Sequence, residues 1–407
     1  MTEQQESVNE AVTEKNKAKL VVLCAGGTGG HFFPAKALSE DLISRGFHVK
    51  FFGDTRGRKY KDQLSEEISY HEIASAAMKS GIMGKLRGIF MLLLGMLQSL
   101  IHYIAHRPAV VVGFGGYPSF PSVMMAQILF IPTIIHEQNA VVGRANRQLS
   151  RGAKKIALSL PDIDGLSEKA KQRAIVTGNP VRQDIADLYT QPYTPSDEDS
   201  EFNLYVFAGS QGARSFSQIV PEAIVALPDE LKARLNITQQ ALEEDMMKVI
   251  DAYDKAKIKA EIKPFFSDVK EILSKAHLVI ARGGASTVAE ITTAGRPAIF
   301  VPYPHHKDHQ QKMNALSIAD HHGGWVLEEG TEFTAENLER RLEMLMNDPE
   351  KLFKTAEAAR DCATPDAARK LGSLVTSVAK GWKPKGLAQK TSNSSEAGSE
   401  NSDGGEG

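Results

Sequence analysis

The segment that decides the fold is KLVVLCAGGTGGHFFPA, residues 19–35. Its first six residues contain the apolar run LVVLC (20–24), which predicts a buried strand, and the glycines after it predict a tight turn into a helix. Glycine lets the backbone approach a ligand, while the start of a helix directs free N–H groups at an anion. Pro34 suits the first turn of such a helix. A strand, a glycine turn and a helix in succession are typical of a parallel α/β sheet.

The same alternation continues through both halves of the chain. Strands are predicted in the first half at 19–24, 48–54, 109–113 and 133–137, and in the second half at 202–209, 260–266, 277–282 and 297–303. Helical segments lie between them, as in βαβ units. We therefore predict an α/β protein with two doubly wound, Rossmann-like parallel-sheet domains. Ligands of such sheets bind beyond the carboxyl ends of the strands, so the site is expected in a cleft between the domains.

Changes in composition divide the chain into segments. Both ends have little to bury and are predicted to be disordered. The acidic stretch QPYTPSDEDSE (191–201) contains two prolines and is typical of a linker. The predicted organisation is a disordered N-terminus (1–18), a first domain (19–181), a linker (182–199), a second domain (200–360), a C-terminal helix packing back on the first domain (361–382) and a disordered Ser/Gly/Glu-rich tail (383–407).

Composition narrows the class of protein. The 407 residues are 42% hydrophobic and 24% charged, with a net charge of -2, which is the balance of a globular protein without a general preference for nucleic acid. The two cysteines, Cys24 and Cys362, lie in different predicted segments, so we expect a reducing cytoplasm and no disulfide framework. The polar N-terminus has no apolar stretch of the kind found in a secretory signal.

One region combines apolar and basic residues. Its longest apolar run, 88–101, is interrupted by Gln98 and Ser99, so we expect no helix that spans a bilayer. Between Glu72 and Asp162 the only acidic residue is Glu137, against nine basic ones. A buried helix explains the apolar residues but not the missing acids. We therefore predict docking on an anionic membrane surface. The residues proposed for it are Lys79, Met83, Lys85, Arg87, Ile89, Phe90 and Leu93.

Four glycine loops follow predicted strands. They are AGGTGGHFFPA (25–35), VGFGGYPSFPS (112–122), FAGSQGARS (207–215) and ARGGASTVAEI (281–291). Together they predict a cleft lined with backbone donors, which suits a ligand with several phosphates or two diphosphate ligands. A nicotinamide-binding site stays open at the first loop because Asp54 could replace the usual ribose acid. However, Phe32 stands where G-x-G-x-x-G needs its third glycine.

Polar residues gather at the same predicted cleft. HEQNAVVGRANR (136–147) offers carboxylate and amide groups that suit sugar hydroxyls or a structural hydrogen-bond network. GNPVR (178–182) supplies Arg182, and HKDHQQKMNAL (306–316) places Gln310 and Gln311 near the start of a helix. His305 and His309 have the i,i+4 spacing of metal ligands, but no zinc motif accompanies them, so no metal is expected.

Seven ordered motifs over about residues 19–380 closely resemble the MurG family. They are GGTGGHFFPA, GFGGYPSFPS, HEQNAVVGRANR, GNPVR, AGSQGAR, GGASTVAEI and DHQQKMNA. The resemblance implies a GT-B fold and an inverting transferase that moves N-acetylglucosamine (GlcNAc) from UDP-GlcNAc to the C4 hydroxyl of undecaprenyl-diphosphoryl-N-acetylmuramoyl-pentapeptide (lipid I). It also implies a peripheral protein on the cytoplasmic face of the inner membrane, active in peptidoglycan synthesis. FAGSQGAR and ARGGAST depart from the common family forms, and the tail after residue 383 has no family counterpart.

The resemblance also implies roles for individual residues. Glu290 would accept hydrogen bonds from the ribose, Ser210 would hold the donor diphosphate, and the backbone of Phe266 would face uracil. The rest of the UDP-GlcNAc site would comprise Thr28, Gly29, Gly30, Asn139, Arg182, Ala285, Thr287, Gln310 and Gln311. The acceptor diphosphate would lie on Gly26, Gly27, Gly115, Gly116 and Tyr117.

The chemistry requires a base for the acceptor hydroxyl and support for departing UDP. His31 is the leading base candidate because its side chain titrates near neutrality at the first loop. Glu137 and His136 are weaker candidates, and no metal or other cofactor is expected. Three alternatives remain: a GT-B enzyme acting on another glycolipid such as diacylglycerol, a nicotinamide-dependent oxidoreductase, and a non-catalytic scaffold that binds nucleotide-sugar.

Overall fold

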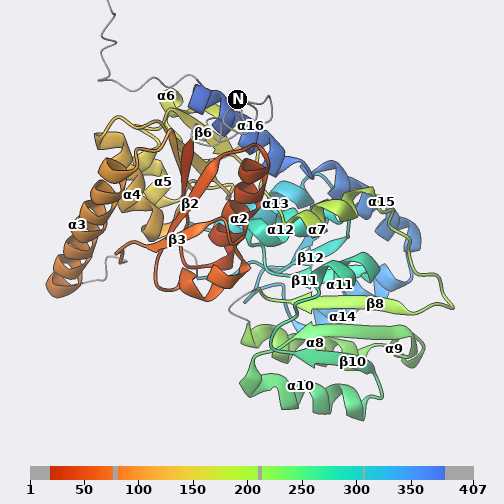
Figure 1. Cartoon of the computed structure of the whole chain (residues 1–407). Helices are drawn as coiled ribbons and strands as arrows, with labels where there is room; N and C mark the ends of the chain where they lie inside the picture. The colour runs from red at the N-terminus through yellow and green to blue at the C-terminus, as the bar shows by residue number, and fades with distance from the viewer. Residues whose placement is uncertain (1–18, 77–80, 210–212, 306–307, 381–407) are drawn as a thin grey trace, which may run out of the picture.

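The computed structural model describes residues 19–76, 81–209, 213–305 and 308–380. The chain forms two lobes, each built on its own sheet (Figure 1). The first sheet has seven strands in the order β3-β2-β1-β4-β5-β6-β7, and the second has six in the order β10-β9-β8-β11-β12-β13. Every pairing within the two sheets is parallel. The predicted fold class, two doubly wound parallel-sheet lobes, is confirmed.

The elements of the first lobe alternate strand and helix along the chain. Its elements are β1 (Leu20–Cys24), α2 (Gly29–Ser44), β2 (His48–Gly53), η1 (Gly57–Gln63), β3 (Ser69–Glu72), α3 (Ile82–Ala105), β4 (Val110–Gly113), α4 (Gly116–Ile128), β5 (Thr133–Glu137), α5 (Arg144–Leu149), β6 (Lys155–Leu158), α6 (Glu168–Lys171) and β7 (Ala174–Val176). The short α7 (Gln183–Ala186) and η2 (Asp187–Thr190) lead to the second lobe.

The second lobe repeats the alternation and ends in three helices. Its elements are β8 (Phe202–Phe207), α8 (Arg214–Ala226), α9 (Asp229–Arg234), β9 (Leu235–Gln240), α10 (Glu243–Lys255), β10 (Lys259–Lys263), α11 (Val269–Lys275), β11 (Leu278–Ala281), α12 (Ala285–Thr293), β12 (Ala298–Phe300), α13 (Gln310–Ala319), β13 (Trp325–Val326), α14 (Ala335–Met346), α15 (Pro349–Asp361) and α16 (Ala367–Lys380).

Strand order reverses next to β1 in the first sheet and next to β8 in the second. At such a switch point the helices after neighbouring strands lie on opposite faces of the sheet, which opens a crevice at the carboxyl ends. The loops after β1 and β4, and those after β8 and β11, therefore border the two crevices. All four predicted glycine loops occupy these positions.

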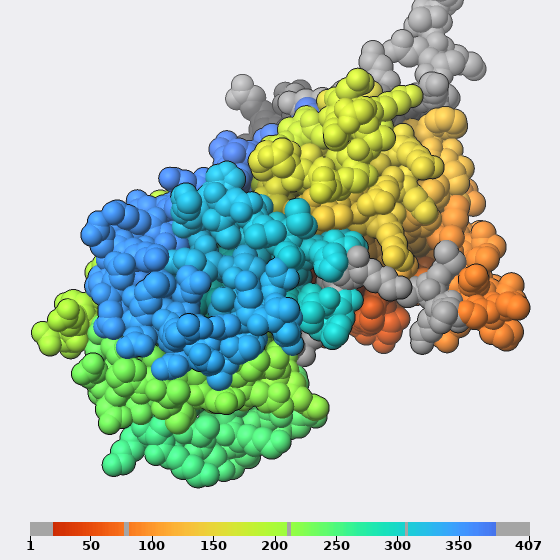
Figure 2. All heavy atoms as spheres, turned by 180° about the vertical axis from the view of Figure 1, so that it is seen from behind, coloured from red at the N-terminus to blue at the C-terminus, as the bar shows by residue number. Residues whose placement is uncertain are grey.

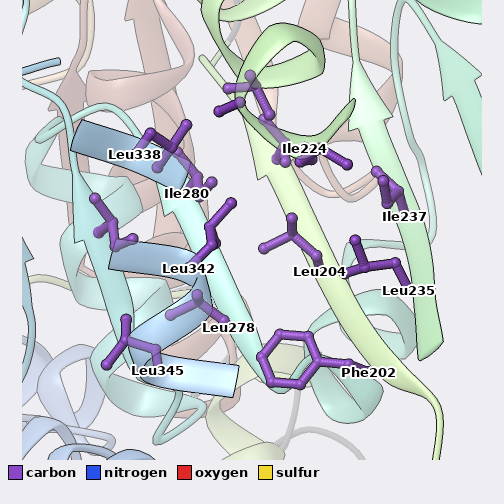
Figure 3. Close-up of a cluster of buried hydrophobic side chains, with 14 of the residues drawn as sticks. Phe202, Leu204, Ile224, Leu235, Ile237, Leu278, Ile280, Leu338, Leu342 and Leu345 are labelled. Atoms are coloured by element: carbon purple, nitrogen blue, oxygen red, sulfur yellow. The ribbon is translucent and has the colours of Figure 1, made fainter. Parts of the chain in front are cut away.

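Each sheet is covered on both faces by apolar side chains. Along β8, Phe202 and Leu204 point to one core and Tyr205 and Phe207 to the other, as the two-residue period of a strand requires. Figure 3 shows the first of these cores, in which Leu342 of α14 approaches the β8 and β11 side chains. Burial on both faces explains why these strands read as almost continuous apolar runs.

The last helix, α16, packs on α2 of the first lobe. Leu371 and Val375 are fully buried in a first-lobe core, and Lys19 Nζ donates a hydrogen bond to the carbonyl of Ala379 (2.9 Å). In the rear view, the blue C-terminal segment runs from the second lobe toward the first (Figure 2). The chain therefore crosses between the lobes twice.

Helix α3 corrects the expectation that no segment is long and apolar enough to span a bilayer. It has 24 residues, and an 18-residue stretch within it has a mean hydropathy of 1.7, so it meets that criterion by length and composition alone. The polar residues that interrupt the run have partners: Gln98 accepts from the N–H of Ala74 (2.7 Å), and Ser99 contacts Ser122 Oγ (2.8 Å). One face of α3 packs on α4, which attaches the helix to the first lobe (Figure 1).

Pro34 also differs from its expectation. It lies inside α2 rather than in the first turn, because the helix already begins in the glycine loop. A proline there has no N–H to give to the carbonyl four residues earlier, that of Gly30. This carbonyl is therefore available to another donor.

Candidate active site

The carboxyl end of β1 leads into the first glycine loop. A Cβ atom on Gly27 would lie 2.4 Å from Asp54 Oδ1 and 2.4 Å from Arg56 Cβ, so the close approach requires glycine. Thr28, the N-cap residue of α2, makes no side-chain capping hydrogen bond. The first N–H groups of α2 thus lack that partner and are suited to bind an anion.

The loop after β4 meets this first loop. Gly115 and Gly116 have φ values of 82° and 74°, in the left-handed region that favours glycine. A Cβ on Gly26 would lie 3.0 Å from Pro118 Cδ, so the two loops touch. Tyr117 is half exposed beside them. The first lobe therefore presents one surface made from two glycine loops and two helix starts.

His31 lies in the first turn of α2, against the second loop. A Cβ on Gly116 would lie 3.3 Å from its Cδ2 atom. Burial lowers the pKa of His31, the negative charge of Glu137 opposes that shift, and the positive charge of Arg56 adds to it. The lowered pKa favours the neutral imidazole, which is the form that accepts a proton.

The carboxylate of Glu137 is enclosed by donors. Its Oε1 accepts from the backbone N–H and the side-chain amide of Asn139, each at 3.1 Å. Its Oε2 accepts from the N–H of Gly143 (3.0 Å) and from Asn146 Nδ2 (2.9 Å). Four donors fill the hydrogen-bonding capacity of a carboxylate. Glu137 thus fixes the shape of the segment after β5.

His136 is fully buried one residue earlier on β5. Its Nε2 atom makes a hydrogen bond with the carbonyl oxygen of Gly178 (3.0 Å), and burial lowers its pKa to about 4. The ring therefore ties the end of β5 to the GNPVR segment.

An asparagine on α13 joins the two lobes. Asn314 is 1% exposed, and its Oδ1 accepts from the N–H of Ala140 (2.8 Å). Its Nδ2 donates to Asn139 Oδ1 and to the carbonyl of Gly283, each at 3.1 Å. One turn earlier, Gln310 donates to a carbonyl of the same first-lobe segment (3.3 Å). These bonds bring the segment after β5 against the loop after β11.

Two helix starts also meet across the cleft. Ser286 Oγ, in the first turn of α12, donates to the carbonyl of Gly30 in the first turn of α2 (3.2 Å). This is the carbonyl that Pro34 leaves without its usual helical donor. Because helix starts carry partial positive charge, their approach concentrates anion-binding potential at this point.

Arg182 and Glu290 face each other beside this contact. Their closest charged atoms, Nε and Oε1, are 3.7 Å apart, and the guanidinium carbon lies 5.9 Å from the centre of the Phe33 ring. Burial raises the pKa of Glu290, and the positive charge of Arg182 opposes that shift. Thr287 and Glu290 are on α12, one turn apart.

Gln311 and Phe266, which are also predicted for the UDP-GlcNAc site, lie in the second lobe. Gln311 Oε1 accepts from the N–H of Tyr303 (2.9 Å), and a Cβ on Gly283 would lie 2.3 Å from the carbonyl oxygen of Gln311. Phe266 is buried with its ring edge-on to Tyr205, 6.3 Å between centres. Among the residues that the structure describes, no group of three or more His, Cys, Asp or Glu side chains is arranged to hold a metal ion.

The chain matches the glycosyltransferase family 28 N-terminal domain over residues 21–158 and the C-terminal domain of the same family over residues 203–371. The chain belongs to glycosyltransferase family 28. The two matched regions correspond to the two lobes, and the resemblance to the MurG family is confirmed.

Known family 28 proteins match almost the whole chain. A UDP-N-acetylglucosamine–N-acetylmuramyl-(pentapeptide) pyrophosphoryl-undecaprenol N-acetylglucosamine transferase of Rhodospirillum centenum is 46% identical over 359 residues, 88% of this chain and 94% of that protein. A Brucella abortus protein of the same name is 43% identical over 89% of this chain and 95% of its own length.

Solved structures agree with the fold. MurG of Acinetobacter baumannii superposes with a TM-score of 0.72 at 30% identity, covering 88% of this chain and 99% of that one. A UDP-glucosyltransferase of Polygonum tinctorium has a TM-score of 0.64 at 14% identity, covering 89% and 99%, and shares the fold alone.

The structure places the family 28 site residues predicted from sequence in three regions. Gly30, Asn139, Arg182, Glu290 and Gln310 take part in contacts where the lobes meet. Gly26, Gly27, Thr28, Gly29, His31, Gly115, Gly116, Tyr117 and Glu137 lie on the adjoining loops, helix starts and strand end of the first lobe, and Phe266, Ala285, Thr287 and Gln311 lie in the second lobe. Ser210 and Lys79 lie outside the described residues. The roles of all these residues stay predictions.

The sequence patterns did not single out Asn314, Ser286 or Arg56, which the structure places in contact with predicted site residues. Asn314 had a usable signal, because it stands four residues after Gln310 and so shares its helix face. The other two depend on contacts between distant segments, which no local pattern reveals.

Proposed function

We propose that this chain transfers GlcNAc from UDP-GlcNAc to the C4 hydroxyl of lipid I, with inversion at the sugar C1 atom, to give lipid II. The observation that carries the proposal is the 46% identity through both lobes to a protein named for this reaction. The contact between the starts of α2 and α12 supports it, since both substrates of this reaction carry a diphosphate.

The donor is assigned to the second lobe. Glu290 accepts from the ribose hydroxyls, exchanging its ion pair with Arg182 for hydrogen bonds to the nucleotide. Ser210 and the start of α12 hold the diphosphate, and the backbone of Phe266 faces uracil. The GlcNAc group lies between Asn139 and Gln310, which both take part in hydrogen bonds between the lobes. The other assigned contacts are Thr28, Gly29, Gly30, Ala285, Thr287 and Gln311.

The acceptor is assigned to the first lobe, with its diphosphate on the loops 26–30 and 113–117. His31 removes the proton from the C4 hydroxyl as that oxygen attacks C1 of GlcNAc. The bond from C1 to the diphosphate oxygen breaks, and UDP leaves with the electron pair. The positive end of α12 stabilises the charge on departing UDP. Glu137, with four donors already in place, positions Asn139 instead of acting as the base.

We also propose that α3 docks the chain on an anionic membrane. Met83 and Phe90 are 80% and 63% exposed, and Lys85 and Arg87 are exposed between them. The exposed apolar residues recur along the helix: Ile82, Met83, Leu86, Ile89, Phe90, Leu93, Leu97, Ile101 and Ile104. A stripe of this length flanked by cations suits a helix lying in the interface of a bilayer.

A transfer assay with two acceptors tests the reaction. Radiolabelled UDP-GlcNAc is incubated with the protein and either lipid I or diacylglycerol in the same detergent. We expect label in the lipid fraction with lipid I and none with diacylglycerol. Labelling of diacylglycerol alone would identify a different glycolipid transferase, and UDP-GlcNAc binding without transfer to either acceptor would favour a nucleotide-sugar-binding scaffold.

A further inference from the structure

The loop after β2 carries a buried carboxylate that the proposed reaction does not use. Asp54 is 7% exposed, and its Oδ1 accepts from the N–H of Gly57 (3.0 Å). Its Oδ2 accepts from Arg56 Nε (2.7 Å). Each carboxylate oxygen thus has one partner within the protein, and the bond to Oδ2 holds the guanidinium of Arg56 in place.

Arg56 is held over the first glycine loop. If Gly27 carried a Cβ atom, that atom would lie 2.4 Å from Arg56 Cβ and 3.0 Å from Arg56 Nε. The arginine is therefore in contact with the loop that opens α2, and a side chain on Gly27 would displace it. Its positive charge is also close enough to His31 to lower the pKa of that residue.

The two Nη groups of the Arg56 guanidinium are available to bind a ligand. Arg56 has 63% of its side chain exposed, and only Nε is used by Asp54, so the two Nη groups have no hydrogen-bond partner among the described residues. An arginine fixed at Nε presents its remaining donors in a planar fork, which matches two phosphate oxygens.

We propose that Arg56 binds the diphosphate of the lipid acceptor on the first-lobe glycine loops. This inference rests on the proposed function. Backbone N–H groups and a helix dipole supply partial positive charge, whereas a diphosphate carries full negative charges. Arg56 adds a charged guanidinium whose two Nη groups are not used by its ion pair with Asp54. Asp54 keeps its guanidinium above the loop, so little side-chain entropy is lost when the acceptor binds.

The neighbouring Arg58 provides a matched control. It lies two residues further on, in η1, and its side chain is 64% exposed, but it pairs with Glu72 at the end of β3. Arg56→Gln and Arg58→Gln remove the same charge two residues apart. Arg56→Lys keeps a charge without the fork.

The test measures the KM of both substrates with a soluble short-chain analogue of lipid I. We expect Arg56→Gln to raise the KM for the acceptor at least about tenfold, as loss of a hydrogen bond to a charged group does. The KM for UDP-GlcNAc and the thermal midpoint should stay within the range of Arg58→Gln, and Arg56→Lys should recover part of the acceptor affinity. An acceptor KM equal to that of Arg58→Gln would overturn the proposal, as would equal losses for donor and acceptor.

A binding measurement separates this proposal from the proposed function. Farnesyl diphosphate and farnesyl monophosphate are titrated into the wild-type protein and into Arg56→Gln by calorimetry. The wild-type protein should prefer the diphosphate, and the variant should lose that preference. The same preference in both proteins would exclude Arg56 even where transfer is normal. If transfer to lipid I fails but the preference depends on Arg56, the function is wrong and the diphosphate site stands.

Discussion

At the scale of residues, the two candidate bases, Glu137 and His31, have different environments. Glu137 has four hydrogen-bond donors around its carboxylate, whereas His31 has a lowered pKa at the meeting point of two loops. A base must be deprotonated before the reaction and must accept a proton during it. This favours His31 for proton transfer and Glu137 for positioning.

His31→Ala should reduce turnover at least about a hundredfold, the usual contribution of a general base. UDP affinity measured by calorimetry should stay near that of the wild-type protein. Because the pKa of His31 lies below 6.5, the acid limb of the wild-type pH profile should also lie below pH 6.5. Wild-type turnover in the variant would exclude His31, and an equal loss of UDP affinity would move it to the donor site.

Glu290→Ala should weaken UDP binding by roughly tenfold or more, since hydrogen bonds from the ribose to a carboxylate contribute about 1.5–3 kcal/mol. Calorimetry with UDP measures this directly. Glu328→Ala, on the same lobe but paired with Lys312, is the control. Unchanged UDP affinity in Glu290→Ala would remove Glu290 from the site.

His136 should make the folded state sensitive to acid. Its pKa is about 4 when folded and 6.5 ordinarily, so the unfolded chain binds more protons between these values. Stability is therefore present above pH 6.5 and is lost as the pH falls toward 4, by at most roughly 3 kcal/mol from this residue. In urea unfolding at pH 7 and pH 4.5, His136→Gln should lose less stability than the wild-type protein. Identical losses would show that His136 is not responsible.

At the scale of elements, strands with strong apolar runs were predictable and weaker ones were not. All eight predicted strands exist within a few residues of their expected bounds. The strands β3, β6, β7, β9 and β13 were missed because they are short or partly polar. In β9, for example, the buried Gln239 accepts from Tyr253 OH (2.6 Å), a partner on α10 that a local pattern cannot reveal.

The packed face of helix α3 also depends on contacts with distant residues. Gly95 lies where a Cβ would be 2.1 Å from the carbonyl of Ala74, so this face of the helix must be small. The sequence predicted an apolar, basic segment, but which face is exposed follows only from its packing on α4.

Replacing Lys85 and Arg87 by Glu should weaken membrane binding. Each cation near an anionic surface contributes about 1 kcal/mol, so loss of both lowers partitioning by roughly thirtyfold. Vesicle sedimentation should show binding that rises with anionic lipid and falls with salt. The exposed pair Lys270 and Lys275 on α11, replaced by Glu, is the control. Equal pelleting of both folded variants with vesicles would contradict docking through α3.

At the scale of the whole molecule, the site exists only because two lobes meet. Residues Ala140 and Asn314 are separated by 174 positions in sequence but share a hydrogen bond. The sequence predicted two facing lobes and most of the residues between them. It did not predict the hydrogen bonds that Asn314 and Gln310 make between the lobes. The relative placement of the two sheets depends on the linker and α16 as well as on each lobe.

The most direct test is a structure of the protein with UDP and a soluble lipid I analogue bound together. UDP should lie on the second lobe, with its ribose at Glu290 and its diphosphate at the start of α12. The acceptor diphosphate should lie on the loops 26–30 and 113–117, with the C4 hydroxyl within hydrogen-bonding distance of His31. Both diphosphates bound to the same lobe, or a C4 hydroxyl remote from His31, would contradict the division of the reaction between the two lobes.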